Sequence, residues 1–125
     1  MPGRQTSKVI AVIDNDESMQ DSLRELIESA GLVTHCYESA EEFLGSDLYG
    51  RAACVIADIG MPKMSGLQLQ ARLKEKGCNI PIIFITAHGD AGMRIQAMRE
   101  GAVEFLTRPF DRQLLLKTVR AALDM

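Results

Sequence analysis

Five short apolar runs alternate with amphipathic stretches along the chain, and this alternation restricts the folds that the chain can adopt. Most of the runs are rich in Val, Ile and Phe, and several are apolar on successive residues. Such runs are typical of strands that are covered on both faces in a parallel sheet. The strands that we expect cover residues 8–13, 33–37, 53–57, 81–85 and 103–106.

The stretches between these runs carry the signals of helices. The first stretch has one apolar face, and Gly31 follows it where a left-handed residue would end a helix. Ser39 and Glu42 have the spacing of a capping box, which predicts the start of a second helix. The apolar face of the first helix consists of Met19, Leu23, Leu26, Ile27 and Ala30.

Three further helices complete the pattern. We expect them over residues 66–75, over residues 91–99 before Gly101, and from the N-cap residue Asp111 to the end of the chain. Five β-α units joined by right-handed crossovers predict an α/β fold. The sequence therefore predicts a doubly wound five-stranded parallel sheet of order 2-1-3-4-5, with helices on both faces.

Length and composition limit the class of protein. The 125 residues suit a single domain over residues 1–125, of which residues 1–7 are expected to be a flexible N-terminal segment. The net charge of -3 gives no electrostatic footprint for nucleic acid, so we expect no direct DNA contact by these residues. The apolar runs are shorter than a membrane span, and the first residues lack a secretion signal. We therefore expect a cytoplasmic protein without membrane contact.

Acidic residues follow two of the predicted strands. Asp14 comes after the first run and Asp58 after the third, and the predicted strand order brings these two strand ends together. Clustered carboxylates repel one another, so the arrangement is favourable only with a bound cation or a proton. Asn15 and Asp16 add further oxygen atoms beside Asp14. Mg²⁺ suits such a site, because it takes a few carboxylates and fills its octahedron with water and phosphate oxygens.

Two more polar residues converge on the same edge of the sheet. Thr86 ends the fourth run and supplies a hydroxyl, and Arg108 follows the fifth run and supplies a cation. Phosphoryl transfer needs little beyond positioning, a metal and donors for the equatorial oxygens. Asp58 is the natural nucleophile, since an aspartate can carry a phosphoryl group as an acyl phosphate.

Taken together, these motifs resemble the receiver domain of bacterial two-component response regulators, a CheY-like, flavodoxin-like fold, over nearly the whole chain. The stretches at residues 85–90 and 101–105 are most similar to the FixJ-type branch. The motifs that carry the resemblance are Asp14-Asn15-Asp16, Asp58 with Met61-Pro62 and Gly66, Thr86-Ala87, and Arg108-Pro109-Phe110.

The resemblance implies a role for each site residue. Asp58 would accept a phosphoryl group from a histidine kinase or a phosphotransfer protein, so the domain would be a signalling acceptor rather than an enzyme. Mg²⁺ would be held by Asp14 through water, by Asn15 as a direct ligand, by Asp58 and by the carbonyl of Gly60. Asp16 would add a carboxylate if the loop let it reach inward.

The resemblance also implies a switch. Thr86 would close on a phosphoryl oxygen, and Phe105 would change rotamer with it. The movement would remodel the face formed by the fourth helix, the fifth strand and the fifth helix, where partners or a second subunit would dock. In similar proteins a DNA-binding output domain often follows such a domain.

The chain departs from the family pattern at two positions. Asn15 stands where the family normally has a carboxylate, and the loss of a formal charge should weaken metal binding. Arg108 stands where the family has a lysine; the guanidinium keeps the charge but is longer and planar. It could clamp the phosphoryl group with two hydrogen bonds, or it could turn out to solvent.

Two other functions compete with the receiver. One is a pseudo-receiver, which never takes phosphate and regulates by docking to a partner; Asn15 and Arg108 favour it. The other is a small phosphatase of the haloacid-dehalogenase type, because a strand followed by Asp14-x-Asp16 is similar to that family's nucleophile motif. Such a phosphatase would leave Asp58 and Thr86 without a role.

Overall fold

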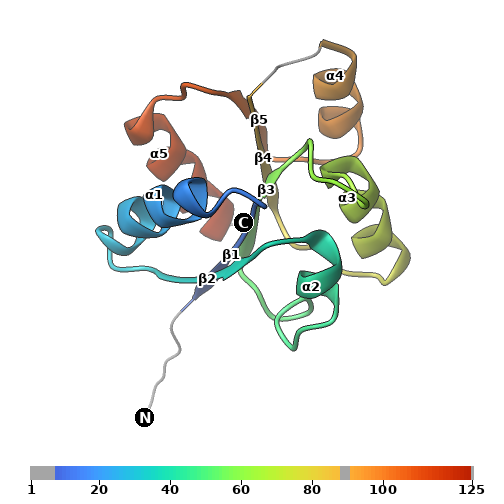
Figure 1. The fold of residues 1–125 in the computed structure, drawn as a ribbon, viewed down its shortest axis with the longest axis horizontal. Coiled ribbons are helices and arrows are strands. Elements are labelled where there is room, and N and C mark those ends of the chain that lie inside the picture. The colour runs from blue at the N-terminus through green and yellow to red at the C-terminus, as the bar shows by residue number, and fades with distance from the viewer. Residues whose placement is uncertain (1–7, 88–90, 125) are drawn as a thin grey trace.

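The computed structural model describes residues 8–87 and 91–124, which form five parallel strands and five helices. The strands pair in the order β2-β1-β3-β4-β5, which confirms the predicted topology (Figure 1). The expected flexible N-terminal segment at residues 1–7 and the last part of the family-like stretch, residues 88–90, lie outside the described residues. The strands are β1 (Val9–Ile13), β2 (Val33–Tyr37), β3 (Cys54–Asp58), β4 (Ile82–Thr86) and β5 (Glu104–Thr107).

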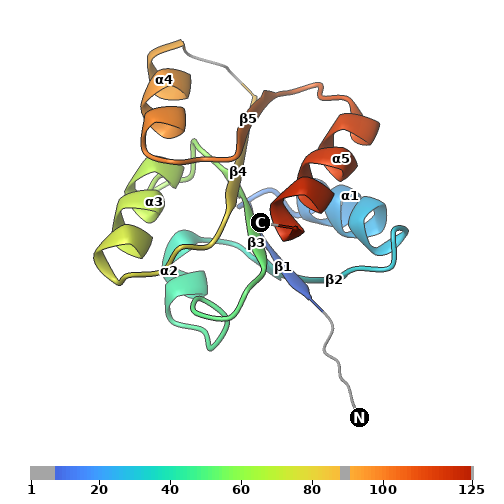
Figure 2. The same cartoon turned by 180° about the vertical axis from the view of Figure 1, so that it is seen from behind.

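The helices cover both faces of the sheet. Helices α1 and α5 lie on one face, and α2, α3 and α4 lie on the other, as the two opposite views show (Figures 1 and 2). None of the described helices is long and apolar enough to cross a membrane. The helices are α1 (Glu17–Glu28), α2 (Ala40–Leu44), α3 (Gly66–Glu75), α4 (Ala91–Arg99) and α5 (Arg112–Leu123).

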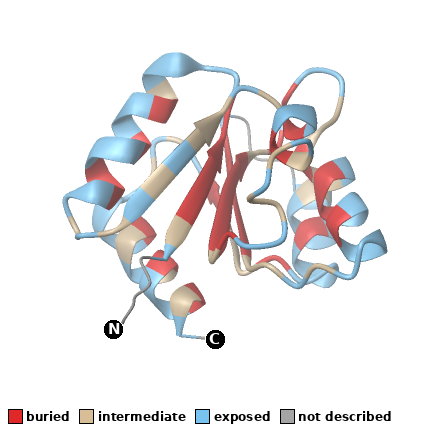
Figure 3. Ribbon diagram, turned by 90° about the horizontal axis from the view of Figure 1, so that it is seen from below, coloured by how far each residue is buried: buried red, intermediate tan, exposed pale blue. Residues whose placement is uncertain are grey.

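Two apolar clusters, one on each face of the sheet, form the core. Strands β1, β3 and β4 are buried along nearly their whole length, whereas the edge strand β2 is partly exposed (Figure 3). On one face Leu23 and Val119 pack against the sheet, and on the other face Phe43 and Leu69 do so. This two-sided burial is what the continuous apolar runs predicted.

Three of the predicted strands end one residue later than expected. Pairing continues to Asp58, which lies opposite Ile85, and to Thr86, which lies opposite Thr107. These polar residues are therefore the last residues of β3 and β4 rather than loop residues, because the parallel pairing extends through them. The sheet itself fixes the backbone of both positions.

Side-chain caps set the beginnings of the helices. Asp111 caps α5, as predicted, and accepts hydrogen bonds from two backbone N–H groups. The predicted capping box at α2 is only half formed: the Ser39 hydroxyl accepts from the Glu42 N–H, but the Glu42 carboxylate accepts from the Glu38 N–H. A complete capping box instead precedes α3, where Ser65 is the N-cap.

Gly66 lies where α3 begins, against the end of β3. A Cβ atom at this position would lie 2.8 Å from Phe84 Cε1 and 2.9 Å from the Ile59 Cα atom. It would also lie 3.1 Å from the carbonyl oxygen of Asp58. The position therefore requires glycine, because the start of α3 lies close to the end of β3 and to Phe84 of β4.

We predict that Gly66→Ala lowers the free energy of unfolding by about 1–3 kcal/mol, because the added methyl group overpacks backbone that cannot move freely. Urea unfolding measures the loss. Gly50→Ala is the matched control, since a Cβ atom at Gly50 meets no atom within 4 Å. Equal losses of stability in the two variants would contradict the conclusion that close packing requires glycine at position 66.

Candidate functional site

The carboxyl ends of β1 and β3 bring two acidic residues together, as the sequence predicted. Ile13 pairs with Ala57, so Asp14 and Asp58 follow at the same level of the two neighbouring strands. Asp14 is only 2% exposed and Asp58 is half-buried. This edge is the switch point of the sheet, where open α/β folds place their ligands.

The Asp14 carboxyl is the most perturbed acid of the site. Burial raises its pKa from the ordinary value of 3.8 to about 6, and the neighbouring Asp58 carboxylate adds to the rise. Two interactions oppose this rise: the Asp16 N–H donates to Asp14 Oδ1 at 2.8 Å, and the positive charge of Arg108 favours the ionised carboxylate. Because the net effect is a raised pKa, the Asp14 carboxyl group is most stable with a proton or a cation bound.

The Asp58 carboxylate is oriented by the loop that follows it. Its Oδ1 atom accepts a hydrogen bond of 3.0 Å from the backbone N–H of Gly60, which is itself exposed. A hydrogen bond between a carboxylate and a backbone N–H two residues later closes a tight turn. One carboxylate oxygen of Asp58 is therefore held at a fixed place on the edge of the sheet.

Asn15 and Asp16 are both exposed in the loop after β1. The Asp16 carboxylate caps α1, because its Oδ1 atom accepts from the Ser18 N–H at 2.9 Å. In this structure the Asp16 carboxylate therefore acts as the N-cap of α1. Its predicted part in metal binding stays a prediction. Asn15 directly follows the buried Asp14 in the chain.

The donor set suits an ion that needs few protein ligands. Within residues 8–87 and 91–124, no three His, Cys, Asp or Glu side chains are grouped as a metal site. Asp14 and Asp58 supply two carboxylates, and the Asn15 amide and the Gly60 carbonyl are the ligands that the sequence added as predictions. Mg²⁺ commonly binds through one or two carboxylates and keeps several waters, so these residues fit that ion.

Thr86 and Arg108 lie at the ends of β4 and β5, on the same edge. Thr86 is 5% exposed, and its carbonyl accepts a hydrogen bond of 2.8 Å from the Arg108 N–H. The Arg108 side chain is half-buried, and its Nε atom is buried without a hydrogen-bond partner among the described residues. The Arg108 cation also lowers the pKa of Asp14, so its charge acts on the acidic pair, and its buried Nε atom shows that the side chain does not extend wholly into solvent.

Phe105 connects the site to the α4 side of the molecule. Its ring is buried and lies 6.5 Å from the ring of Phe84, centroid to centroid. Its carbonyl oxygen accepts a 2.8 Å hydrogen bond from Arg94 Nη1, and Arg94 Nη2 lies 3.6 Å from a carboxylate oxygen of Glu104. The sequence does not indicate this contact, because nothing near Arg94 in the chain links it to β5.

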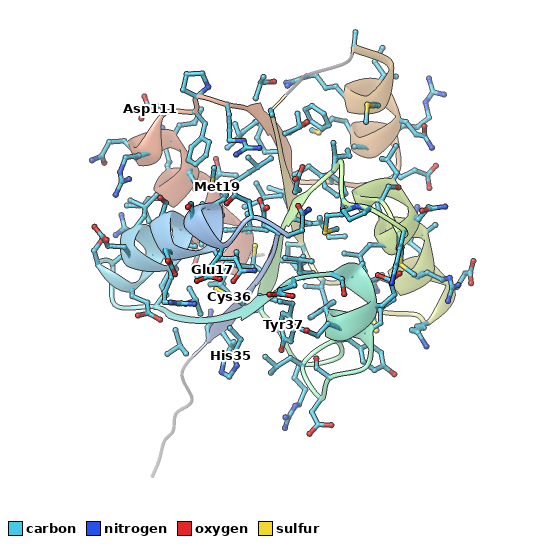
Figure 4. The ribbon with its side chains drawn as sticks, viewed as in Figure 1. Glu17, Met19, His35, Cys36, Tyr37 and Asp111 are labelled. Atoms are coloured by element: carbon cyan, nitrogen blue, oxygen red, sulfur yellow. The ribbon has the colours of Figure 1, made fainter. Side chains whose placement is uncertain are left out.

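Gln20 is a second residue that the sequence did not single out. It is 8% exposed on α1, and its side-chain amide donates to the carbonyl oxygens of Asp14 and Tyr37. Figure 4 shows Met19 on α1 and Tyr37 at the end of β2, the two elements that Gln20 joins. The one sign of its role in the sequence was that a polar residue lies on the apolar face of the predicted helix.

Comparison with known proteins gives consistent matches. The response regulator receiver domain family matches residues 10–120. The response regulator protein TodT of Pseudomonas putida is 44% identical over 119 residues, which are 95% of this chain and 52% of TodT. The chain thus spans about half the length of that relative.

Two solved structures are also similar. The response regulator StyR is 39% identical, with a TM-score of 0.88 over 95% of this chain and 60% of that one. The crystal structure of FixJ-N is 30% identical, with a TM-score of 0.85 over 96% of both chains.

Asp14→Asn should stabilise the metal-free protein at pH 8. In the folded protein the Asp14 carboxyl loses its proton at a pH of about 6, whereas its ordinary pKa is 3.8. The folded state therefore holds the extra proton between these values, and stability falls as the pH rises through 6. We expect the variant to be more stable than the wild type by about 1–3 kcal/mol at pH 8 and to lose this advantage below pH 4.

Unfolding by urea with a chelator present, at pH 8 and again at pH 4, measures this difference. The asparagine side chain keeps an amide oxygen that can accept the hydrogen bond from the Asp16 N–H, so the substitution removes the charge and not this bond. A variant that is less stable than the wild type at pH 8 would contradict the prediction.

Proposed function

Since this chain belongs to the family of response regulator receiver domains, we propose that Asp58 accepts a phosphoryl group from a histidine kinase or a phosphotransfer protein. The observation that carries the proposal is the buried Asp14, whose pKa of about 6 results from burial and from the Asp58 carboxylate. Such a pair favours a cation, and a cation beside Asp58 would allow an anionic phosphoryl donor to approach.

We assign Asp14, Asp58, the Asn15 amide and the Gly60 carbonyl to a Mg²⁺ ion. The ion, when bound, would supply positive charge for the phosphoryl oxygens. The chain's own groups would do the rest. The Gly60 N–H holds one oxygen of the Asp58 carboxylate, so the other oxygen is the one that would attack.

Arg108 and Thr86 are the proposed ligands of the phosphoryl group. The buried, unpartnered Arg108 Nε is a donor for which the described residues offer no acceptor, and a phosphoryl oxygen would provide one. The Thr86 hydroxyl lies at the end of the adjacent strand and would donate to another oxygen. The domain would thus act chemically only on itself, in self-phosphotransfer and autodephosphorylation.

The proposed output is the surface formed by α4, β5 and α5. Ile95, Met98 and Leu114 are exposed apolar side chains on its helices, which suits docking of a partner or of a second copy. The hydrogen bond from Arg94 to the Phe105 carbonyl would pass a movement of β5 to α4. In a longer protein, this surface would control an output domain such as a DNA-binding domain.

A second candidate function is phosphorylation-independent docking by a pseudo-receiver. Asn15 removes a formal charge from the site, and Arg108 replaces the family's lysine, which favours this reading. The haloacid-dehalogenase alternative gains no such support. Its acid/base would be Asp16, whose carboxylate is exposed and caps α1.

We predict that incubation with acetyl phosphate and Mg²⁺ adds one phosphoryl group to the chain, because the acidic edge holds the ion beside Asp58. Intact-mass spectrometry measures the product. Asp58→Asn is the matched control, since the amide keeps the shape but not the nucleophile. If the folded wild type gains no mass from acetyl phosphate or from a cognate kinase, the pseudo-receiver is the correct function.

Restoring the family residues should strengthen the site. We expect Asn15→Asp to raise Mg²⁺ affinity about fivefold, because it adds a formal charge to the ligand set. Arg108→Lys should raise the phosphorylation rate, because a compact ammonium is a better point charge for the phosphoryl oxygen. Calorimetric Mg²⁺ titration and the time course of mass gain check the two effects, and no change in either would refute this account of the departures.

A further inference from the structure

Gln20 is a polar residue on the buried face of α1. Its side chain is 8% exposed and lies in the same helix as the core residues Leu23 and Ile27. Burying an amide without partners costs free energy, so a buried glutamine is retained where its hydrogen bonds are satisfied. The partners of Gln20 therefore indicate what the residue does.

The Gln20 amide joins three elements at the acidic edge. Its Nε2 atom donates to the Asp14 carbonyl at 2.6 Å, after β1, and to the Tyr37 carbonyl at 3.2 Å, at the end of β2. The Tyr37 carbonyl also accepts from the Asp14 N–H at 3.0 Å. Both backbone polar groups of Asp14 are thus fixed, one by β2 and one by Gln20.

The fixed backbone determines where the Asp14 carboxylate lies. Its Oδ1 atom accepts from the Asp16 N–H at 2.8 Å, and the Asp16 carbonyl in turn accepts from the Gln20 N–H at 3.0 Å. The backbone bond from residue 20 to residue 16 is the first hydrogen bond of α1, whereas the bond to residue 14 depends on the Gln20 side chain. Groups of this kind, which orient a metal ligand without touching the metal, commonly change metal affinity 10- to 100-fold when removed, as an order of magnitude.

We propose that Gln20 is a positioning residue for the Asp14 carboxylate and that it preorganises the β1–α1 loop for a divalent cation. The proposal rests on the proposed function, because the cation is the one assigned to Asp14 and Asp58. Gln20 does not touch the ion; it acts through the backbone of Asp14.

Gln20→Met tests this role, because methionine has a similar length and loses both donors. Gln70→Met is the matched control: Gln70 is 4% exposed, and its Nε2 atom donates to the Ala97 carbonyl at 3.1 Å, between α3 and α4. Both variants lose a buried amide. Only Gln20→Met should weaken Mg²⁺ binding, by about tenfold in calorimetric titration, whereas Gln70→Met should stay within about twofold of the wild type. Equal Mg²⁺ affinities of the two variants would overturn the proposal.

A measurement on the metal-free protein separates this proposal from the proposed function. The Asp16 N–H should exchange with solvent about tenfold faster in Gln20→Met than in Gln70→Met, because its acceptor, the Asp14 carboxylate, is less well held. If the wild type binds no Mg²⁺, the metal assignment fails, and this exchange rate alone decides the role of Gln20. An unchanged exchange rate would overturn that role.

A third measurement covers the case in which Gln20→Met does not fold. In the wild-type chain, the side-chain amide resonances of Gln20 should shift when Mg²⁺ saturates the protein, and those of Gln70 should stay in place. Gln20 resonances that do not move would refute the proposal.

Discussion

The burial of the Asp14 carboxylate beside the Asp58 carboxylate is the interaction on which the rest of the site depends. The parallel pairing of β1 with β3 places the two acids at one edge, and the core below them leaves Asp14 2% exposed. Burial and like charge both oppose ionisation, so the pKa of Asp14 rises to about 6. The fold therefore maintains a site whose charge is balanced best by a cation.

The surrounding groups restrain this unfavourable pair and offset its charge only in part. Backbone N–H groups at Gly60 and Asp16 hold one oxygen of each carboxylate, and Gln20 holds the backbone of Asp14. Arg108, the residue after β5, contributes positive charge. A new charge at Asp58 would therefore act on β5, and the hydrogen bond from Arg94 to Phe105 ties β5 to α4. The proposed phosphorylation site and the proposed output surface are thus connected through β5.

The apolar runs and right-handed crossovers predicted a doubly wound sheet. The order 2-1-3-4-5, one of the common orders of such sheets, predicted that Asp14 and Asp58 meet. The sequence pattern was not enough to predict the contacts of Gln20 and Arg94, which join residues far apart in the chain. The inward position of Arg108 depends on packing around its Nε atom, which no local pattern encodes. The half-formed capping box at Ser39 shows the same limit, since Glu42 binds the Glu38 N–H instead.

The most direct test of this account is the titration of the Asp14 carboxyl by carbon-13 NMR, with and without Mg²⁺. The account predicts a pKa of about 6 in the metal-free protein and a lower pKa when Mg²⁺ is bound, because the ion favours the carboxylate. An ordinary pKa without the ion, or a pKa that Mg²⁺ does not change, would contradict the central role of the buried acidic pair.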